Sequence, residues 1–407
     1  MTSAPLSRIY GARLTVLRVA LASAMALMST RAAYPQAYSV LYSFAGSPDG
    51  ANPTAALVRD SKGTLYGTTF FGGAGACGCG TVFMLTKTGI EKVLYSFTGG
   101  SDGADPWAAL IRDASGSLYG TTIQGGHLGC APPGGCGTVF RVDARGTERV
   151  LHAFAAGTDG QFPYAGLLGD AAGNLYGTTV NGGQRSTNFG IVFKIDSTGK
   201  ETVLHRFTGG KDGAFPFGTL IAQSDGCLYG TTSMFGEAGS GTTFCLTANG
   251  ILTTVNSFAG RTGESPFAGL VGDGAGNFYG TTGLGGASGV GTVFVVDRAG
   301  KERVLHHFRG GADGASPYGD LVRDSAGNLY GTTNAGGGSG CGGSGCGTVF
   351  KLNKNGKETL LYSFTGGTDG GIPYAGLIRD PAGNLYGTTF IGGATGNGVV
   401  FKLSELP

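Results

Sequence analysis

The stretch Leu385-Tyr386-Gly387-Thr388-Thr389 decides the fold, because near copies of it recur along the chain. The tyrosines of the copies stand at positions 66, 119, 176, 229, 279, 330 and 386, so successive copies are 50 to 57 residues apart. This interval is longer than one turn of a solenoid and fits a unit of four short strands. The chain is therefore predicted to contain seven copies of one structural unit.

Each unit contains four β-rich runs, which we name strands a to d from the innermost outward. Residues 374–379 and 385–389 represent strands a and b, and residues 348–352 and 359–364 represent strands c and d. Runs of this length between turns rich in Gly, Asn and Asp are typical of antiparallel hairpins. The sequence therefore predicts an all-β, seven-bladed β-propeller made of four-stranded antiparallel blades.

The two ends of the repeat region predict how the ring closes. A lone d-type strand, 40–44, precedes the first complete unit, and the last unit ends after its strand c, 399–403. Pairing these two strands would complete the seventh blade and remove the open edges of the array. We therefore expect residues 38–407 to form one propeller domain closed by its own N-terminal strand.

The first 37 residues have the pattern of a secretory signal peptide. Arg8, Arg13 and Arg18 precede an apolar run from Val19 to Met28, which small residues follow. This run is shorter than the ~18 apolar residues that a membrane-spanning helix needs, and no other stretch reaches that length. Residues 1–37 are thus expected to be removed on export. The protein is expected to be secreted, periplasmic or at the cell surface, with no membrane span.

The charge of the chain argues against nucleic acid as a partner. Its formal net charge is +2, and loss of four arginines with the signal peptide gives 2 − 4 = −2. Binding to phosphates requires a concentrated basic face, and no run of Lys or Arg provides one. We expect a monomer whose partner is a glycan or an extracellular protein.

The repeat unit also resembles a known family. The pattern "GNLYGTT…GG…G-GTVFKL…GKET-LYSF-GG-DG" is similar to the GloVer-type tandem repeat, or choice-of-anchor tandem repeat, of exported bacterial proteins. The resemblance extends over residues 38–403 and implies a β-propeller outside the cytoplasm. It implies no established activity and no catalytic residues. The C-terminal sorting anchor that is frequent in this family does not follow residue 403.

Eight cysteines occur in four local pairs. They are Cys77 with Cys79, Cys130 with Cys136, Cys227 with Cys245, and Cys341 with Cys346. An even number of cysteines in an exported chain favours disulfides. Cys227 and Cys245 are expected to oppose each other directly across the hairpin of strands b and c. Because the spacings do not form Cys-x₂-Cys zinc knuckles, no metal is predicted.

Aromatic residues follow the proline that opens strand a in six of the seven units. They are Trp107, Tyr164, Phe217, Phe267, Tyr318 and Tyr374, and Thr54 is the exception. Strand a begins at the propeller face that carries the longer loops, where ligands are expected to bind. Trp107, Tyr164, Tyr318 and Tyr374 are therefore predicted to bind a ligand by stacking on sugars. The alternative is that these rings wedge between neighbouring blades, because repeated residues usually serve the repeat.

Residues that break the repeat are the candidates for catalysis. Asp320 stands in strand a where the other units have Gly, Ala or Thr, and His127 lies in the long b–c loop of blade 2 near Asp105. No hydrolase, metalloprotease or phosphate-loop motif occurs. The leading hypothesis is a binding or scaffold module without a cofactor. The alternative is a polysaccharide lyase or glycoside hydrolase. A metal-dependent lactonase is a weaker option, based on fold analogy alone.

Overall fold

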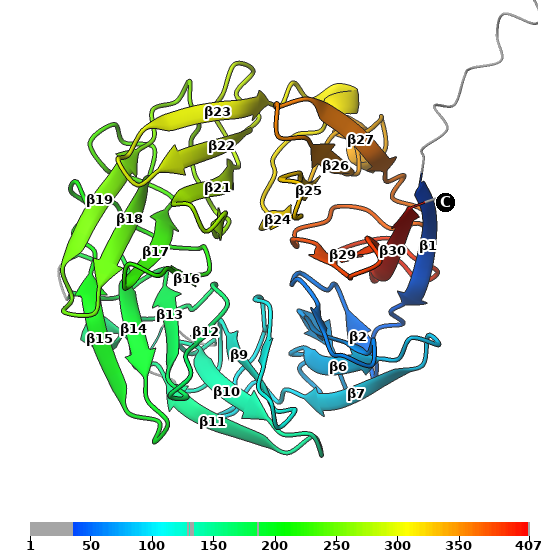
Figure 1. Cartoon of the computed structure of the whole chain (residues 1–407). Coiled ribbons are helices and arrows are strands. Elements are labelled where there is room, and N and C mark those ends of the chain that lie inside the picture. Colours follow the sequence, from blue (N-terminus) through cyan, green and yellow to red (C-terminus); the bar gives the residue numbers. More distant parts are fainter. Residues whose placement is uncertain (1–35, 128–129, 131–133, 185–186, 406–407) are drawn as a thin grey trace, which may run out of the picture. The chain divides into compact units, whose positions relative to one another are not determined.

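The described part of the chain forms seven four-stranded antiparallel sheets arranged in a ring, which confirms the seven-bladed propeller (Figure 1). Residues at the centre of the ring line a channel. The computed structural model describes residues 36–127, 130, 134–184 and 187–405. The predicted signal peptide therefore lies almost entirely outside the described residues. Within the described residues, no helix is long and apolar enough to span a bilayer.

The strands of the first four blades run from the axis outward in sequence order. Blade 1 comprises β3 (Val58–Arg59), β4 (Leu65–Thr69), β6 (Thr81–Leu85) and β7 (Glu91–Ser96). Blade 2 comprises β8 (Ile111–Arg112), β9 (Leu118–Thr122), β10 (Thr138–Val142) and β11 (Glu148–Ala153). Blade 3 comprises β12 (Leu168–Gly169), β13 (Leu175–Thr179), β14 (Ile191–Ile195) and β15 (Glu201–Arg206). Blade 4 comprises β16 (Ile221–Ala222), β17 (Cys227–Thr232), β18 (Thr242–Thr247) and β19 (Leu252–Ser257).

The remaining blades follow the same plan until the last one, which takes its outer strand from the N-terminal end. Blade 5 comprises β20 (Val271–Gly272), β21 (Asn277–Thr282), β22 (Thr292–Asp297) and β23 (Glu302–His307). Blade 6 comprises β24 (Val322–Arg323), β25 (Leu329–Thr333), β26 (Thr348–Leu352) and β27 (Glu358–Ser363). Blade 7 comprises β28 (Ile378–Arg379), β29 (Leu385–Thr389), β30 (Val399–Glu405) and β1 (Gln36–Ser43).

A few short elements lie in the loops. β2 (Gly50–Ala51) pairs with β5 (Phe71–Gly72). The 3₁₀ turns are η1 (Gly157–Asp159), η2 (Gly311–Asp313) and η3 (Cys341–Gly343). The innermost strand of each blade has only two residues, fewer than the run 374–379 predicts. The preceding residues of that run line the channel rather than continue the sheet.

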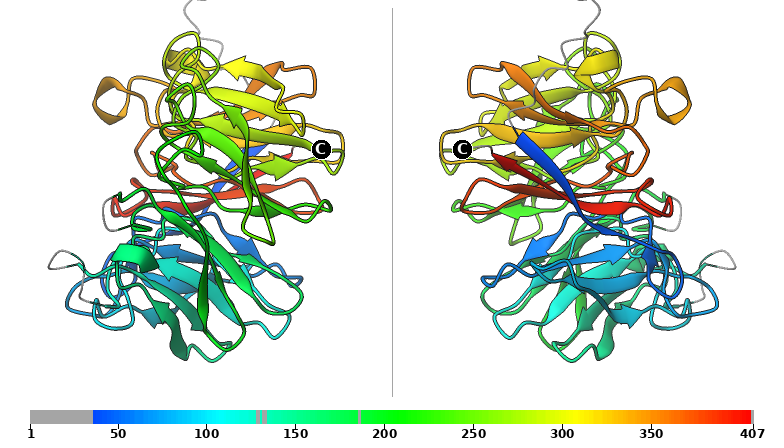
Figure 2. Two further views of the ribbon diagram at one scale, coloured as in Figure 1. Left: turned by 90° about the vertical axis from the view of Figure 1, so that its left-hand side faces the viewer. Right: turned by 90° about the vertical axis from the view of Figure 1, so that its right-hand side faces the viewer.

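β1 closes the ring as predicted. It pairs with β30 from Gln36 opposite Glu405 to Ser43 opposite Val399, and the pairing shifts register between Val40 and Tyr42. The two strands lie side by side at the outer edge of blade 7 (Figure 2, right). The pairing is longer than the predicted 40–44 with 399–403, because it begins at Gln36.

Each residue of the repeated Leu-Tyr-Gly-Thr-Thr stretch has its own structural role. In blade 7, Leu385 is fully buried, and the hydroxyl of Tyr386 donates a hydrogen bond of 3.0 Å to Asp380 in the a–b turn. A Cβ on Gly387 would come within 2.6 Å of the ring of Phe401, so only glycine leaves room for that ring. The stretch therefore encodes the packing of strand b against strand c.

The two threonines of the stretch join strands and blades. The hydroxyl of Thr388 donates to the backbone carbonyl of Ala55 in blade 1 at 3.1 Å, and Thr332 donates in the same way to Ala375 at 2.8 Å. The second threonine works within one blade, since the hydroxyls of Thr333 and Thr348 lie 2.8 Å apart. Each bond between blades contributes about 1 kcal/mol to stability.

The hydrophobic core lies between neighbouring blades. Val82 and Phe97 of blade 1 pack with Leu118 and Phe140 of blade 2, and all four are almost completely buried. The rings of Phe97 and Phe140 meet edge to face at 5.0 Å. Because no blade buries its own face alone, the blades depend on their neighbours for stability.

Candidate functional site

Six aromatic side chains line one cavity at the mouth of the central channel. They are Trp107, Tyr164, Phe217, Phe267, Tyr318 and Tyr374, which we call the aromatic collar, and the cavity has a volume of about 320 Å³. Each collar residue directly follows the proline that precedes strand a and is partly exposed. The six residues that the sequence picks out by their position thus gather in one place, although they come from six different blades.

The collar is a closed ring of contacts. Neighbouring ring centroids lie 5.2–6.2 Å apart around the whole circle, from Trp107 and Tyr164 to Tyr374 and back to Trp107. Most neighbouring pairs are steeply inclined, and Tyr318 and Tyr374 are stacked. Such pairs contribute about 0.5–1.5 kcal/mol each beyond the area they bury. The rings therefore connect neighbouring blades and also form the cavity wall.

The only tryptophan stands beside the one blade that lacks an aromatic residue. Blade 1 supplies Thr54, which is buried and donates its hydroxyl hydrogen to the carbonyl of Trp107 at 3.0 Å. The indole of Trp107 reaches past this position to Tyr374, with the centroids 5.6 Å apart. The larger ring of Trp107 thus completes a circle that would otherwise be open at blade 1.

Residues that the sequence analysis did not single out support the collar from the b–c loops. The ring centroids of Phe70 and Trp107 lie 5.3 Å apart, and those of Phe390 and Tyr374 lie 5.4 Å apart; both pairs are edge to face. Each follows the second threonine of its repeat. Blade 5 has Gly283 at this place, where a Cβ would come within 2.6 Å of the Tyr318 ring. Aromatic residues at this recurring position are the sequence signal for the second layer.

The backbone before each collar residue is held in an uncommon conformation. The residue preceding each proline has a positive φ of 54–59°, and these residues are Asn52, Asp105, Phe162, Phe215, Ser265, Ser316 and Ile372. A positive φ costs free energy in residues other than glycine. In blade 2, the Asp105 N–H donates to the carbonyl of Cys79, and its own carbonyl accepts from Ile123. This recurring bridge between blades fixes the direction in which the collar rings point.

The polar groups of the collar are available to a ligand. Within the described residues, the hydroxyls of Tyr164, Tyr318 and Tyr374 and the indole N–H of Trp107 have no hydrogen-bond partner. Burial raises the pKa of the Tyr164 hydroxyl, and the charge of Asp105 raises it further. The Tyr164 hydroxyl is therefore a neutral hydrogen-bond donor and acceptor at physiological pH.

A second, smaller cavity of about 90 Å³ lies inside the channel. The collar forms part of its wall, and strand a supplies the remainder, including Thr219 and Asp320. Asp320 Oδ1 accepts a 2.7 Å hydrogen bond from the N–H of Gly269 in blade 5. Burial raises the pKa of the Asp320 carboxyl, and this hydrogen bond partly opposes the effect. The predicted location of Asp320 in the channel thus agrees with the structure.

The three candidate catalytic residues do not form one constellation. Asp320 lines the inner cavity, whereas Asp105 and His127 line neither of the two channel cavities. Asp105 is half-buried near Tyr164, and loss of hydration raises its pKa to about 6. His127 is exposed in the b–c loop of blade 2. Neither channel cavity therefore holds more than one of the three candidates.

One group of potential metal ligands lies elsewhere among the described residues. Ligand atoms of His152, Asp159 and Glu201 all lie within 4.8 Å of one another near the outer strands of blades 2 and 3. The same position in blade 1 holds Tyr95, whose hydroxyl donates to Asp102 at 2.9 Å. His152 and Asp159 thus reproduce a contact that links strand d to the following loop in six of the seven units, which favours a structural role.

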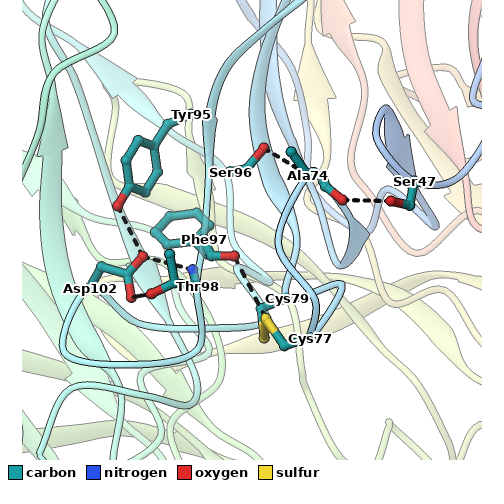
Figure 3. The surroundings of a disulfide bond; sticks show 10 residues. Ser47, Ala74, Cys77, Cys79, Tyr95, Ser96, Phe97, Thr98 and Asp102 are labelled. Carbon is teal, nitrogen blue, oxygen red and sulfur yellow. Dashed lines mark hydrogen bonds between the residues drawn. A yellow bond between two sulfur atoms is a disulfide. The ribbon is translucent and has the colours of Figure 1, made fainter.

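All four predicted cysteine pairs form disulfides. In blade 1, Cys77 Sγ lies 3.7 Å from the carbonyl oxygen of Phe97, where the b–c loop meets the end of strand d (Figure 3). The prediction that Cys227 and Cys245 are directly opposed is wrong. Cys227 pairs with Thr247 and Cys245 with Tyr229, so the disulfide is diagonal, with a Cα–Cα distance of 5.5 Å. The disulfides therefore fix loops and one hairpin locally.

Comparisons with known proteins agree with this architecture. The chain resembles the extracellular domain of the putative one component system BT4673 from B. thetaiotaomicron, with a TM-score of 0.56 and 13% identity over 91% of this chain and 42% of that one. It also resembles XC5397, a gluconolactonase from Xanthomonas campestris, with a TM-score of 0.47 and 13% identity over 91% of this chain and 89% of that one. The likeness to the BT4673 domain shows the fold alone. No curated protein sequence matches the chain.

The repeat itself identifies the family. The sequence profile of the Gloeobacter/Verrucomicrobia repeat matches residues 28–244 and 217–406, which together span the seven blades. This match agrees with the family resemblance of the repeat unit described in the sequence analysis. The chain therefore belongs to the Gloeobacter/Verrucomicrobia repeat family.

Proposed function

We propose that the protein is an extracytoplasmic binding module whose ligand, a glycan, enters the channel mouth and is held by the aromatic collar. One observation carries this proposal. Six aromatic side chains from six blades converge on a single cavity of about 320 Å³, large enough for part of a small ligand. Their free hydroxyls lie at the same place.

The chemistry of the collar suits a sugar. A pyranose ring presents apolar C–H faces that pack on aromatic rings, and its hydroxyls need hydrogen-bond partners when they leave water. Trp107, Phe217 and Phe267 supply apolar surface, and the three tyrosines add hydroxyl groups. Apolar walls with a few polar groups are typical of small-molecule sites.

A competing hollow on the opposite face is less suited to a ligand. It has a volume of about 450 Å³ between blades 2 and 3, and Asp113 and Tyr119 contribute to its wall. Asp113 already accepts hydrogen bonds from Ser115, Ser117 and Tyr119. The Asp113 carboxylate and the Tyr119 hydroxyl thus already form hydrogen bonds within the blade, whereas the hydroxyls of the collar have no such partner in the described part of the chain.

The same geometry favours binding over catalysis. A glycoside hydrolase needs two carboxyl groups that flank one bond, and the channel cavities contain Asp320 alone. Elimination from an acidic polysaccharide needs a base and a group that neutralises the substrate carboxylate, but no Lys, Arg or His lines either cavity. A catalytic zinc site uses three protein ligands, which these cavities also do not supply.

Export fits this role. Four disulfides in one chain are characteristic of an oxidising compartment. Together with the predicted signal peptide, they support a location outside the cytoplasm, where free glycans and surface proteins are the available partners. An extracellular protein that carries a glycan would bind to the same aromatic collar through that glycan.

A glycan array, read in parallel with turnover assays on neutral and acidic polysaccharides, tests the proposal. The Trp107→Ala variant should lose at least tenfold in affinity for the bound glycan, because the collar opens at blade 1. Ile90→Ala provides the matched control, since Ile90 is an apolar residue on the opposite face and is 66% exposed. A folded Trp107→Ala variant that binds as the wild type does, or turnover of any array glycan, would refute the proposal.

A further inference from the structure

A single carboxyl group lies in the channel just inside the collar. The residues equivalent to Asp320 in the other blades are Ala56, Ala109, Gly166, Thr219, Gly269 and Gly376, and none of them can carry a charge. Several of these small residues belong to the same wall of the inner cavity. Blade 6 therefore supplies the one carboxyl group in an inner cavity whose other described lining residues carry no carboxyl group and no cationic side chain.

The structural role of Asp320 does not require its charge. Its Oδ1 accepts the N–H of Gly269 from the neighbouring blade at 2.7 Å. Thr219 performs the same task two blades earlier, where its hydroxyl accepts the N–H of Gly166 at 3.2 Å. Since a neutral hydroxyl is sufficient for this contact between blades, the carboxylate of Asp320 is available for another purpose.

The surroundings leave this carboxylate without a counter-ion. The other titratable residues that line the two cavities are Tyr164, Tyr318 and Tyr374, and no cationic side chain is among the lining residues. Burial without a counter-ion disfavours the charged form, which agrees with the raised pKa of Asp320. A positively charged ligand group would remove this penalty, whereas an anionic ligand would increase it.

The collar has dimensions that suit a cation. Neighbouring centroids are 5.2–6.2 Å apart in a closed circle of six. In a regular hexagon the distance from the centre to a corner equals the side, so the centre of the collar lies about 5.5 Å from the six centroids. This distance is within the ~6 Å range of cation–π attraction for any ring that turns its face inward. An ammonium group at that centre would be close to the rings and would have the cavity that Asp320 lines beside it.

We propose that the ligand is an amine-bearing glycan, whose sugar rings pack on the aromatic collar and whose ammonium group pairs with Asp320. This inference rests on the proposed function and specifies its ligand class. The collar provides surface for the sugar, and the inner cavity of about 90 Å³ admits only a small group such as an amine. Acetylation of the amine would remove its charge and add bulk, and would therefore abolish the preference.

Calorimetry with two matched probes tests this inference. The probes are the tetramers of glucosamine and of N-acetylglucosamine, titrated into the full chain at near-neutral pH and low salt. We expect the glucosamine tetramer to bind at least tenfold more tightly, since a charge-assisted hydrogen bond is stronger than a neutral one. Asp320→Asn, which keeps the acceptor for Gly269, should erase this difference by weakening the amine probe alone.

The controls separate the inference from the function on which it rests. Asp143→Asn removes the same charge from a c–d turn on the opposite face, where Asp143 bonds to backbone N–H groups, and should leave both affinities unchanged. Equal binding of the two tetramers to the wild type, or an unchanged preference in Asp320→Asn, would overturn the role of Asp320 and keep the glycan site. Binding of neither tetramer would overturn the inference, and a negative glycan array would overturn the proposed function as well.

Discussion

Replacing Phe44 by Ala measures how firmly the N-terminal strand closes the ring. Phe44 directly follows β1, is fully buried, and meets the rings of Tyr42 and Phe83 at 5.2 and 5.1 Å. Its N–H donates to the carbonyl of Gly398 at 3.1 Å. Full burial of such a side chain contributes about 3 kcal/mol, and the cavity left behind raises the expected cost of the substitution to about 3–5 kcal/mol.

Phe97→Ala is the matched comparison. Phe97 holds the same position after β7, is equally buried, and meets Tyr95 and Phe140 at 5.2 and 5.0 Å. β7 follows its partner strand through a short turn, whereas β1 reaches β30 from the other end of the propeller sequence. If β1 is as firmly docked as an internal strand, the two substitutions will cost the same free energy of unfolding.

Equilibrium unfolding in urea provides the measurement, followed by circular dichroism and by the fluorescence of Trp107, the only tryptophan. Val40→Ala serves as a control, because Val40 is 37% exposed on the same strand and its loss should change stability by less than about 0.5 kcal/mol. If Phe44→Ala lowers the free energy of unfolding by less than about 1 kcal/mol while Phe97→Ala lowers it by about 3–5 kcal/mol, closure by a tightly packed β1 is refuted.

Three other perturbations concern the periphery, the collar and the loops. Burial, with a smaller contribution from a nearby aspartate, raises the pKa of four strand-d glutamates to about 7, namely Glu91, Glu148, Glu201 and Glu358. The folded state thus keeps protons that the unfolded state releases near pH 4.5. Thermal melts should therefore show stability falling as pH rises from about 4.5 to about 7. Replacing the four glutamates by Gln should flatten this dependence of stability on pH. Thr54→Phe adds a seventh ring to a closed collar and should reduce glycan affinity at least tenfold, whereas Thr54→Ser should bind normally. Replacing Cys341 and Cys346 by Ala releases a loop with a sequence separation of 5, and urea unfolding should show a loss of about 2 kcal/mol with an unchanged circular dichroism spectrum.

The ring and its closure could be predicted because they depend on backbone pairing, which the repeat displays directly. A d-type strand ahead of the first unit and a missing one after the last leave a single way to complete seven blades. The channel position of Asp320 could be predicted for the same reason, since a residue aligned with small innermost residues shares their place. Both predictions follow because every repeat places equivalent residues at equivalent positions of its blade.

Contacts between side chains of different blades were less predictable. The reach of Trp107 past Thr54 to Tyr374 depends on the curvature of the ring, which no single repeat contains. The diagonal bond between Cys227 and Cys245 depends on a register that spacing alone does not determine. The exposure of His127 reflects an unusually long loop, whose direction the flanking strands do not specify.

The pairing of Gln36 with Glu405 has a consequence for the order of the chain. The two ends of the described chain meet on neighbouring strands, so a short linker could join them without disturbing a blade. New ends could then be placed in an exposed loop between two strands, since such sites tolerate circular permutation. A permutant that begins with strand a of blade 1 and carries β1 after β30 would have seven blades of continuous sequence. The native order of the strands along the chain is thus one of several that would form the same ring. In the native order, blade 7 contains both ends of the described chain.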